Sequence, residues 1–231
     1  MNDASRLLDA ALFAAQRHKD QRRKDAEGSP YINHPLAVAR LLSVEGGISD
    51  TEVLMAALLH DTVEDTETTA QELEALFGKR VTDIVLEVTD DKTLPKARRK
   101  QLQISNSSLK SAEAALVKIA DKICNLRDVA ASPPFDWPIK RRREYFEWAE
   151  QVVSRLPHVD IKLRQLFTSA FELMPSALVG ASNCTRVTAN RNGLKEHVTF
   201  RDHESASMKL FIKEWQKKGA TVTTERGVWI D

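Results

Sequence analysis

The sequence predicts a mainly α-helical protein, a helical bundle that carries a small α+β appendage at its C-terminal end. Two observations predict this class. Over residues 3–173, apolar side chains recur at the three- and four-residue spacing of helices. After Met174 and Pro175, the chain becomes rich in threonine and valine with partial alternation, which is typical of β-strands. We therefore expect a helical domain at residues 1–174 and a C-terminal extension at residues 175–231.

Capping residues and glycines delimit the expected helices of the first domain. Ser49 or Asp50 caps a helix whose middle is apolar on nearly all sides, so we place that helix at the domain centre. Thr68 or Thr69, together with Glu72, forms a capping box for the next helix. The helices expected in chain order are one with an apolar stripe at Leu7, Leu8, Ala11, Leu12 and Ala15, one from near Pro35 to Gly46, and the segments 51–66, 69–77, 79–91, 94–105, 111–130, 139–156 and 160–174.

The C-terminal extension is expected to contain strands and one helix in the order β-β-α-β. Its strand-like segments are residues 185–190, 196–202 and 220–231, and residues 206–219 have the spacing of a helix. About 50 residues make a weak independent core. We therefore expect the extension to dock on the helical domain or on another subunit, and in the second case the protein is a homo-oligomer.

Composition and charge limit the class of protein. Hydrophobic residues make up 42% and charged residues 29% of the chain, as in folded globular proteins. The formal net charge of +1 gives no global field for nucleic acid, so we expect no nucleic-acid partner, and any attraction for a polyanion must come from local clusters. No segment approaches the roughly 20 apolar residues of a membrane span. Cys124 and Cys184 do not form a disulfide framework, and a cytoplasmic location is expected.

Two adjacent residues of metal-ligand type, His60 and Asp61, end the apolar central helix. Burying an aspartate costs several kcal/mol unless it is paired or binds a metal. Glu64 and Asp65 follow, and they share a face with His60 and Asp61 if the helix continues for one more turn. Without a cation, three carboxylates gathered at one point repel one another. The alternative interpretation is a solvated acidic helix end.

Two further residues complete a pattern of histidine, histidine-aspartate and aspartate. His34 stands at the start of a helix, and Asp121 interrupts an apolar helical stripe where an acid needs a partner. Two histidines and two aspartates suit Mn²⁺, Fe²⁺, Zn²⁺ or Co²⁺, and the lack of thiolates argues against a structural zinc site. Such a metal polarises a phosphoryl oxygen or lowers the pKa of water. Glu64 and Asp65 are placed to hold or deprotonate an attacking water.

Three clusters of basic residues accompany this pattern. Each alone is commonly a solvated face, but together, flanking a metal site, they suit a substrate with several phosphates. Phe146 and Trp148, which follow the third cluster, are expected to pack in the core. The clusters comprise Arg22, Arg23 and Lys24; Lys92, Lys96, Arg98, Arg99 and Lys100; and Lys140, Arg141, Arg142 and Arg143.

Five segments together resemble a known family: RRKDAEGSPYINHPLAVARLL, ALLHDTVEDT, FGKRVTDIVLEVTDDKTLPK, LVKIADKICNLRD and EYFEWAEQVV. They resemble the HD-domain hydrolase half of RelA/SpoT proteins. The resemblance is greatest to the stand-alone form of that half, the small alarmone hydrolases, which include the metazoan SpoT homologues. It covers roughly residues 4–172, and the motifs are specific as an ordered set.

The resemblance implies an HD-domain helical bundle and a Mn²⁺-dependent 3′-pyrophosphohydrolase. Its substrates are (p)ppGpp-type alarmones or their adenosine counterparts, (p)ppApp, and its products are the nucleoside 5′-phosphate and pyrophosphate. The synthetase domain of the long relatives is missing, so the chain is expected only to degrade alarmones. The implied residues are His34, His60, Asp61 and Asp121 as metal ligands, Glu64 and Asp65 as the catalytic pair, and Arg23, Lys24, Lys96, Asn125, Arg141 and Tyr145 as substrate contacts.

Two other functions stay open. The metazoan relatives also resemble an NADPH 2′-phosphatase in activity, and that enzyme or another nucleotide phosphatase would use the same metal and water. A non-catalytic alarmone-binding module is the second alternative, although a pure sensor does not need Glu64 and Asp65. The extension at residues 175–231 has no counterpart in the short family members, and its role is not predicted.

Overall fold

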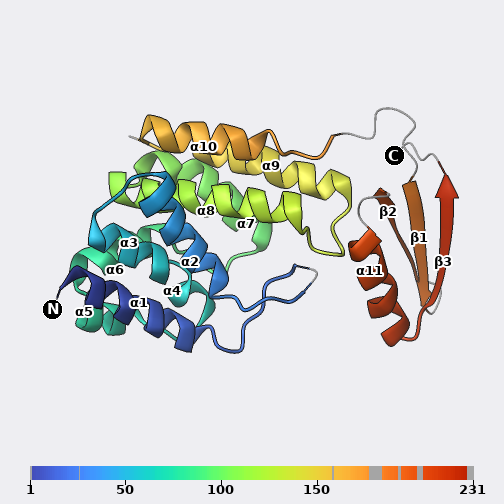
Figure 1. The fold of residues 1–231 in the computed structure, drawn as a ribbon, viewed down its shortest axis with the longest axis horizontal. Helices are drawn as coiled ribbons and strands as arrows, with labels where there is room; N and C mark the ends of the chain where they lie inside the picture. The colour runs from blue at the N-terminus through green and yellow to red at the C-terminus, as the bar shows by residue number, and fades with distance from the viewer. Residues whose placement is uncertain are drawn as a thin grey trace.

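The computed structural model describes residues 2–25, 27–157, 159–176, 184–191, 194–201 and 205–227. Helices fill most of the chain up to Phe171, and a small sheet with one helix follows, which confirms the predicted fold class (Figure 1). The helical elements are α1 (Asp3–Arg17), α2 (Asn33–Arg40), a π-helical turn (Leu41–Glu45), α3 (Thr51–Leu59), α4 (Thr62–Asp65), α5 (Ala70–Phe77), α6 (Lys79–Val88), α7 (Lys96–Asn106), a 3₁₀ turn (Ser107–Leu109), α8 (Ala112–Ala131), α9 (Ile139–Val153) and α10 (Ile161–Phe171). The C-terminal elements are β1 (Cys184–Arg191), β2 (Leu194–Arg201), α11 (Ser205–Lys217) and β3 (Thr221–Gly227).

Local signals set several of these helix ends. Asp50 is the N-cap of α3, where its carboxylate accepts hydrogen bonds from the backbone N–H groups of Glu52 and Val53. Thr69 caps α5 by accepting from the N–H of Glu72 at 3.2 Å. Gly78 then ends α5 with a φ of +87°, which a residue with a side chain rarely adopts. The capping predictions for these two helices are therefore confirmed, and Asp50 and Thr69 are the residues that cap.

The core of the bundle is built around α3 and α8. Every residue from Val53 to Leu59 is buried, as the apolar run predicted, and α3 contacts α1, α2, α6 and α8. The 20-residue helix α8 contacts α2, α3, α6, α9 and α10. Both helices therefore cross the middle of the bundle, and the polar side chains they carry there are enclosed by packed helices. No helix among the described residues is long and apolar enough to cross a membrane.

The structure corrects several predicted helix limits, and α6, α9 and α10 each end three residues earlier than expected, at Val88, Val153 and Phe171. The expected helix over residues 51–66 is interrupted, because α3 ends at Leu59 and α4 begins at Thr62. The hydroxyl of Thr62 donates to the Leu59 carbonyl at 2.7 Å and satisfies one backbone acceptor at the break. The helix expected to start near Pro35 begins two residues earlier, at Asn33. The interruption of residues 51–66 matters for the site, because the break lies at His60 and Asp61.

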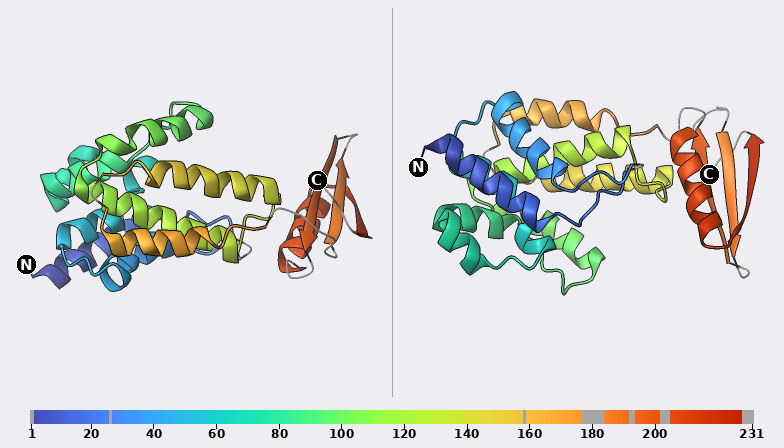
Figure 2. Two further views of the ribbon diagram at one scale, coloured as in Figure 1. Left: turned by 90° about the horizontal axis from the view of Figure 1, so that it is seen from above. Right: turned by 60° about the horizontal axis from the view of Figure 1, so that its bottom comes forward.

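The C-terminal elements form an antiparallel sheet in the order β2-β1-β3, which confirms the predicted β-β-α-β sequence. Helix α11 covers one face of the sheet, and the unit lies beyond the end of the bundle where α8 passes into α9 (Figures 1 and 2). The part of the third predicted strand beyond Gly227 lies outside the described residues. The division of the chain into domains at residue 174 stays a prediction.

Candidate active site

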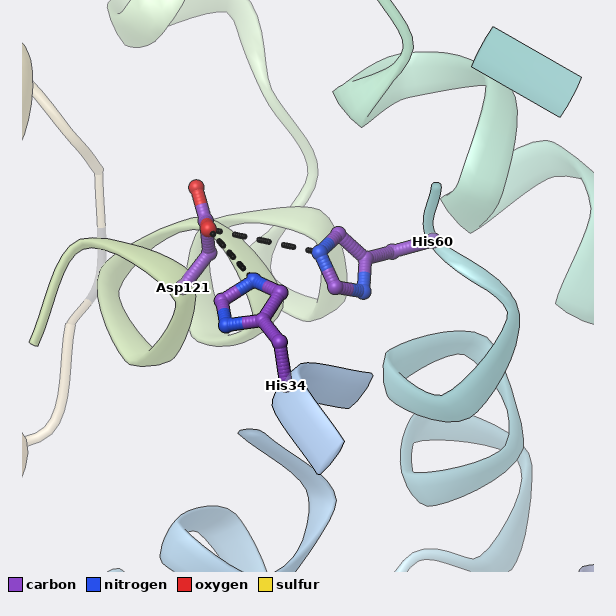
Figure 3. Close-up of side chains that lie close together, drawn as sticks. All are labelled: His34, His60 and Asp121. Atoms are coloured by element: carbon purple, nitrogen blue, oxygen red, sulfur yellow. Dashed lines mark ion pairs between the residues drawn. The ribbon is translucent and has the colours of Figure 1, made fainter. Parts of the chain in front are cut away.

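Three helices bring four predicted metal ligands together. His34 lies in the first turn of α2, His60 directly follows α3, and Asp121 lies in the middle of α8. The ligand atoms of His34, His60 and Asp121 all lie within 4.8 Å of one another, and these three side chains point to one spot (Figure 3). Nε2 of His34 is 3.2 Å from Oδ1 of Asp121, and Nε2 of His60 is 4.0 Å from the same oxygen. Asp61 joins this centre, with Oδ2 3.1 Å from Nε2 of His60.

His60 has the tautomer that a metal ligand needs. Its Nδ1 is 2.8 Å from the carbonyl oxygen of Ala57, which can only accept, so Nδ1 carries the hydrogen. In the neutral ring, Nε2 then keeps its lone pair and faces the carboxylates. This nitrogen is buried and lies 3.1 Å from Oδ2 of Asp61, so it needs either a proton or a cation between itself and that oxygen. A bound cation would take the place of that proton.

The charges of the centre also favour a cation. Burial lowers the pKa of His60, but the neighbouring carboxylates of Asp61 and Asp121 outweigh burial and raise that pKa to about 9. Burial raises the pKa of Asp121, but the positive charge of Lys122 and the hydrogen bond with His34 hold it well below its usual range. Both carboxylates are therefore ionised, and the space between them and the histidines attracts positive charge.

Hydrogen bonds orient both aspartates of the centre. The hydroxyl of Tyr31 donates to Oδ2 of Asp61 at 2.7 Å. Lys122 donates to Oδ2 of Asp121 at 3.0 Å, and the amide of Asn125 donates to its Oδ1 at 2.5 Å. Such outer contacts fix the direction of a ligand oxygen. The sequence reasoning missed Tyr31 and Lys122, although Tyr31 lies in the YINHP motif and Lys122 directly follows Asp121.

Glu64 and Asp65 are adjacent on α4, and because consecutive residues of a helix do not share a face, they point to different sides. Oε2 of Glu64 accepts from the backbone N–H of Asp90 at 2.9 Å, and Oε1 lies 3.7 Å from the guanidinium of Arg99. Burial raises the pKa of Glu64, and the negative charges around it act in the same direction. A carboxyl group with a raised pKa is suited to exchanging a proton near neutral pH.

Asp65 lies in a hydrogen-bonded chain that reaches α1. Its Oδ2 accepts from the amide of Gln21 at 2.9 Å, and Lys92 pairs with its other oxygen. Gln21 in turn bonds to Nδ1 of His18 at 2.7 Å, and the ring of His18 lies 4.9 Å from that of Tyr31. Asp65 is therefore held in place, and the same group of side chains supports the Tyr31 that contacts Asp61. Sequence reasoning did not identify Gln21 or His18 as part of the site.

Two cavities flank the centre and share the rings of Trp137 and Tyr145. The Glu64 cavity, of about 550 Å³, is lined by Glu64 and several basic residues. The His34 cavity, of about 670 Å³, is lined by His34 and Asp65 among others. All predicted substrate contacts line a cavity: Lys96 and Arg141 line the Glu64 cavity, Arg23, Lys24 and Asn125 line the His34 cavity, and Tyr145 lines both.

The Glu64 cavity concentrates positive charge. Burial lowers the pKa of Lys96, and the nearby charges of Arg141 and Lys24 lower it further. Burial also lowers the pKa of Lys100, as does the charge of Lys96. Positive side chains in one cavity repel one another, and an anionic ligand bound there stabilises their charged forms. The cavity is therefore suited to phosphate groups.

The aromatic residues of α9 have two roles. Phe146 is fully buried and Trp148 nearly so, which confirms the prediction that they pack in the core. Trp148 also lines the Glu64 cavity, where the ammonium groups of Lys122 and Lys100 lie 4.4 and 4.7 Å from its ring centre. The ring therefore helps to accommodate two positive charges.

A helical bundle that gathers two histidines and two aspartates at its centre is the arrangement of the HD domain. The HD domain family model matches residues 10–145, which include all four of these residues. The chain therefore belongs to the HD domain family.

Curated relatives narrow the comparison to one branch of that family. A guanosine-3′,5′-bis(diphosphate) 3′-pyrophosphohydrolase, MESH1, of Xenopus tropicalis is 60% identical over 155 residues, which are 67% of this chain and 87% of the relative. The human protein of the same name is 54% identical over 171 residues, 74% of this chain and 96% of the relative. The bifunctional (p)ppGpp synthase/hydrolase SpoT of Escherichia coli is 36% identical over 70% of this chain but only 23% of its own length.

A solved structure supports the same relationship. It belongs to a metazoan orthologue of SpoT that hydrolyses ppGpp, and it superposes with a TM-score of 0.70 at 46% identity, covering 72% of this chain and 94% of the other. A second solved structure, lmo0812 from Listeria monocytogenes, has a TM-score of 0.52 at 29% identity, covering 64% of this chain and 99% of the other. These comparisons confirm the resemblance to the small alarmone hydrolases.

Proposed function

We propose that this chain is a metal-dependent 3′-pyrophosphohydrolase that degrades (p)ppGpp-type alarmones, with (p)ppApp as a further substrate. One observation carries the proposal. Four metal-type ligands converge beside two cavities rich in basic residues, with Glu64 in one cavity and Asp65 in the other. The animal relatives, which are named ppGpp 3′-pyrophosphohydrolases, support the choice of reaction.

Mn²⁺ is the proposed cofactor. His34, His60, Asp61 and Asp121 would hold it, because two imidazole nitrogens and two carboxylate oxygens suit Mn²⁺ and related divalent ions. When bound, such an ion polarises a phosphoryl oxygen and lowers the pKa of water. The position of the His60 Nε2, which faces carboxylate oxygens of Asp61 and Asp121, supports this assignment.

Glu64 and Asp65 are the proposed catalytic pair. They orient the attacking water and take its proton, and the raised pKa of Glu64 suits that exchange. The water oxygen forms a bond to the phosphorus attached to the 3′-oxygen, and the bond from that phosphorus to the 3′-oxygen breaks. The 3′-oxygen takes up a proton, pyrophosphate leaves, and the nucleoside keeps its 5′-phosphates.

The cavity residues are proposed to bind the two ends of the substrate. Lys96 and Arg141 in the Glu64 cavity, and Arg23 with Lys24 in the His34 cavity, provide charge for phosphates on either side. Tyr145 lies at the junction of the cavities, where a nucleobase or ribose could stack or pack. A nucleotide with separate 3′ and 5′ phosphate groups matches this distribution of charge and aromatic surface.

A substrate panel tests the proposal. We would measure kcat/KM for ppGpp, pppGpp, ppApp, pppApp and NADPH, with Mn²⁺ and after chelation. We expect turnover of the 3′-diphosphate nucleotides that is lost on chelation. A preference for NADPH would replace the proposal with a 2′-phosphatase, and tight alarmone binding without turnover would make the chain a binding module.

A cytoplasmic location stays a proposal as well, and cell fractionation checks it.

A further inference from the structure

The C-terminal elements form a unit with its own small core. The side chains of Val187, Ala189, Val198, Phe200 and Phe211 are 3% exposed or less and cluster between the sheet and α11. This cluster is separate from the core of the helical bundle. The unit also lies outside residues 10–145, which match the HD domain. Its role is therefore not explained by the family to which the chain belongs.

A side chain of the helical part packs against the core of this unit. Phe135 belongs to the loop between α8 and α9, and its ring centre lies 6.5 Å from that of Phe211. Phe135 is half-buried by this contact. On α9, Arg143 donates to the carbonyl of Pro175 at 2.8 Å, just before the extension leaves the bundle. The unit is thus attached at the α8–α9 end of the bundle, where Figures 1 and 2 both place it.

The same loop also forms part of both cavities. Trp137, two residues after Phe135, lines the Glu64 cavity and the His34 cavity. Its ring lies 5.5 Å from that of Tyr145, and the guanidinium of Arg141 lies 4.6 Å above it. Phe135 and Trp137 therefore connect one short loop to the C-terminal unit on one side and to the candidate substrate site on the other.

The loop has little freedom to move one of these side chains without the other. The N–H of Trp137 donates to the carbonyl of Pro134 at 3.0 Å and closes a tight turn around Phe135. Pro133 and Pro134 before Phe135, and Pro138 after Trp137, fix φ on both sides of this turn. Because the turn hydrogen bond ties Trp137 to the residue before Phe135, a shift of Phe135 that disturbs the turn also moves Trp137.

From these contacts we infer that the C-terminal unit is a positioning element of the substrate site, which holds the 132–138 loop by burying Phe135 and thereby places Trp137 beside Tyr145. The inference deepens the proposed function and rests on it for the identity of the ligand. Phe135 acts through Trp137 and is a positioning residue. The unit is expected to raise nucleotide affinity without taking part in the chemical step.

Hydrogen exchange tests the physical link independently of any activity. Backbone amides of residues 132–142 would be compared in the wild type, Phe135→Ala and Phe211→Ala. Phe211→Ala removes a fully buried ring from the C-terminal unit and loosens that unit. We expect exchange in the loop to be about tenfold faster in both variants, because local stability depends on the buried contact. Unchanged loop exchange while exchange in β1 rises in Phe211→Ala would overturn the inference.

Kinetics with ppGpp test the consequence for the site. Phe135→Ala is expected to raise KM about tenfold with kcat nearly unchanged, the size expected when one or two side chains must be ordered on binding. Phe135→Leu should restore most of the wild-type KM. Phe13→Ala is the matched control, because Phe13 packs against Phe77 in the helical part. An equal KM in Phe135→Ala and wild type, or a KM raised equally by Phe13→Ala, would overturn the inference, whereas an inactive wild type would refute only the proposed function.

Discussion

Asp121 lies between the histidines of the centre and a buried ammonium group. Its Oδ1 faces His34, and its Oδ2 accepts from Lys122. The side chain of Lys122 is 4% exposed, and its ammonium lies over the ring of Trp148. A buried lysine needs such partners, because an unpaired charge inside a protein is costly. Lys122 therefore fixes which oxygen of Asp121 faces the metal centre.

Replacing Lys122 tests this role. Lys122→Met keeps the length of the side chain and removes the hydrogen bond, so we expect metal affinity to fall about tenfold or more, the size typical of outer-shell contacts. Titration calorimetry with Mn²⁺ measures the change. Lys118→Met is the control, because Lys118 is also buried on α8 but donates to the Val88 carbonyl. Equal losses in both variants would show that the positive charge matters and the hydrogen bond does not.

Glu64 provides a prediction about rate and pH. Glu64→Gln is expected to bind metal normally and to lose about 10²-fold in kcat, as for loss of a general base. Burial raises the pKa of Glu64 above 4.5, so the base is protonated, and kcat falls, as the pH drops through that raised value. A pH–rate profile should show this acidic limb in the wild type and not in the variant. Exposed Glu67→Gln serves as the control, and an unchanged rate in Glu64→Gln would remove that residue from the chemistry.

Residue types predicted that His60, Asp61 and Asp121 need polar or charged partners, because acids next to apolar helices have few structural uses, whereas His34 was assigned through the family resemblance. The contacts that orient these ligands were harder to find. Tyr31 is 30 positions from Asp61, and Gln21 is 44 positions from Asp65. Neither Tyr31 nor Gln21 stands out in the sequence, and only the packing of the helices brings each of them to the site.

At the scale of elements, the helical run is broken between α3 and α4, at His60 and Asp61. The sequence around His60 and Asp61 contains no glycine or proline, so its pattern predicted a continuous helix. At the break, Asp61 accepts a hydrogen bond from the hydroxyl of Tyr31. Local propensity could not show the break, because tertiary contacts override it.

Arg80 links α6 to the starts of α3 and α8. We expect these contacts to make the stability of the protein depend on pH. Its guanidinium donates to Asp50 and Glu52 at the start of α3 and to Glu113 at the start of α8. Arg80→Met should lower the free energy of unfolding by about 1 kcal/mol at pH 7, since the groups are partly exposed. Urea unfolding measures this value. Lys79→Met, which removes an exposed pair with Asp83, should change it much less.

The acidic partners set the pH window of that effect. Hydrogen bonds from Arg80 lower the pKa of both Asp50 and Glu52 in the folded protein. A lowered pKa contributes stability above the unfolded value, about 4, and this contribution is lost as the pH falls through the folded value. The difference between wild type and Arg80→Met should therefore shrink below about pH 4. A difference that stays constant down to pH 2 would contradict this assignment.

At the scale of the whole molecule, the change from helical spacing to threonine-rich alternation was enough to predict both parts of the fold. The position of the C-terminal unit was not predictable, because a core of about 50 residues offers no periodic signal for its docking partner. Two docking places were expected for the C-terminal unit. The contact between Phe135 and Phe211 places the unit on the helical part of the same chain. A homo-oligomer stays a prediction, which light scattering checks.

The proposed 3′-pyrophosphohydrolase activity is defined by the bond that the protein breaks. The most direct measurement is hydrolysis of ppGpp by the Mn²⁺-loaded protein in water labelled with oxygen-18, with mass analysis of the products. Attack at the phosphorus attached to the 3′-oxygen predicts pyrophosphate that carries the label and unlabelled GDP, and no reaction after chelation. Release of orthophosphate, label in the nucleotide, or turnover that survives chelation would contradict the account.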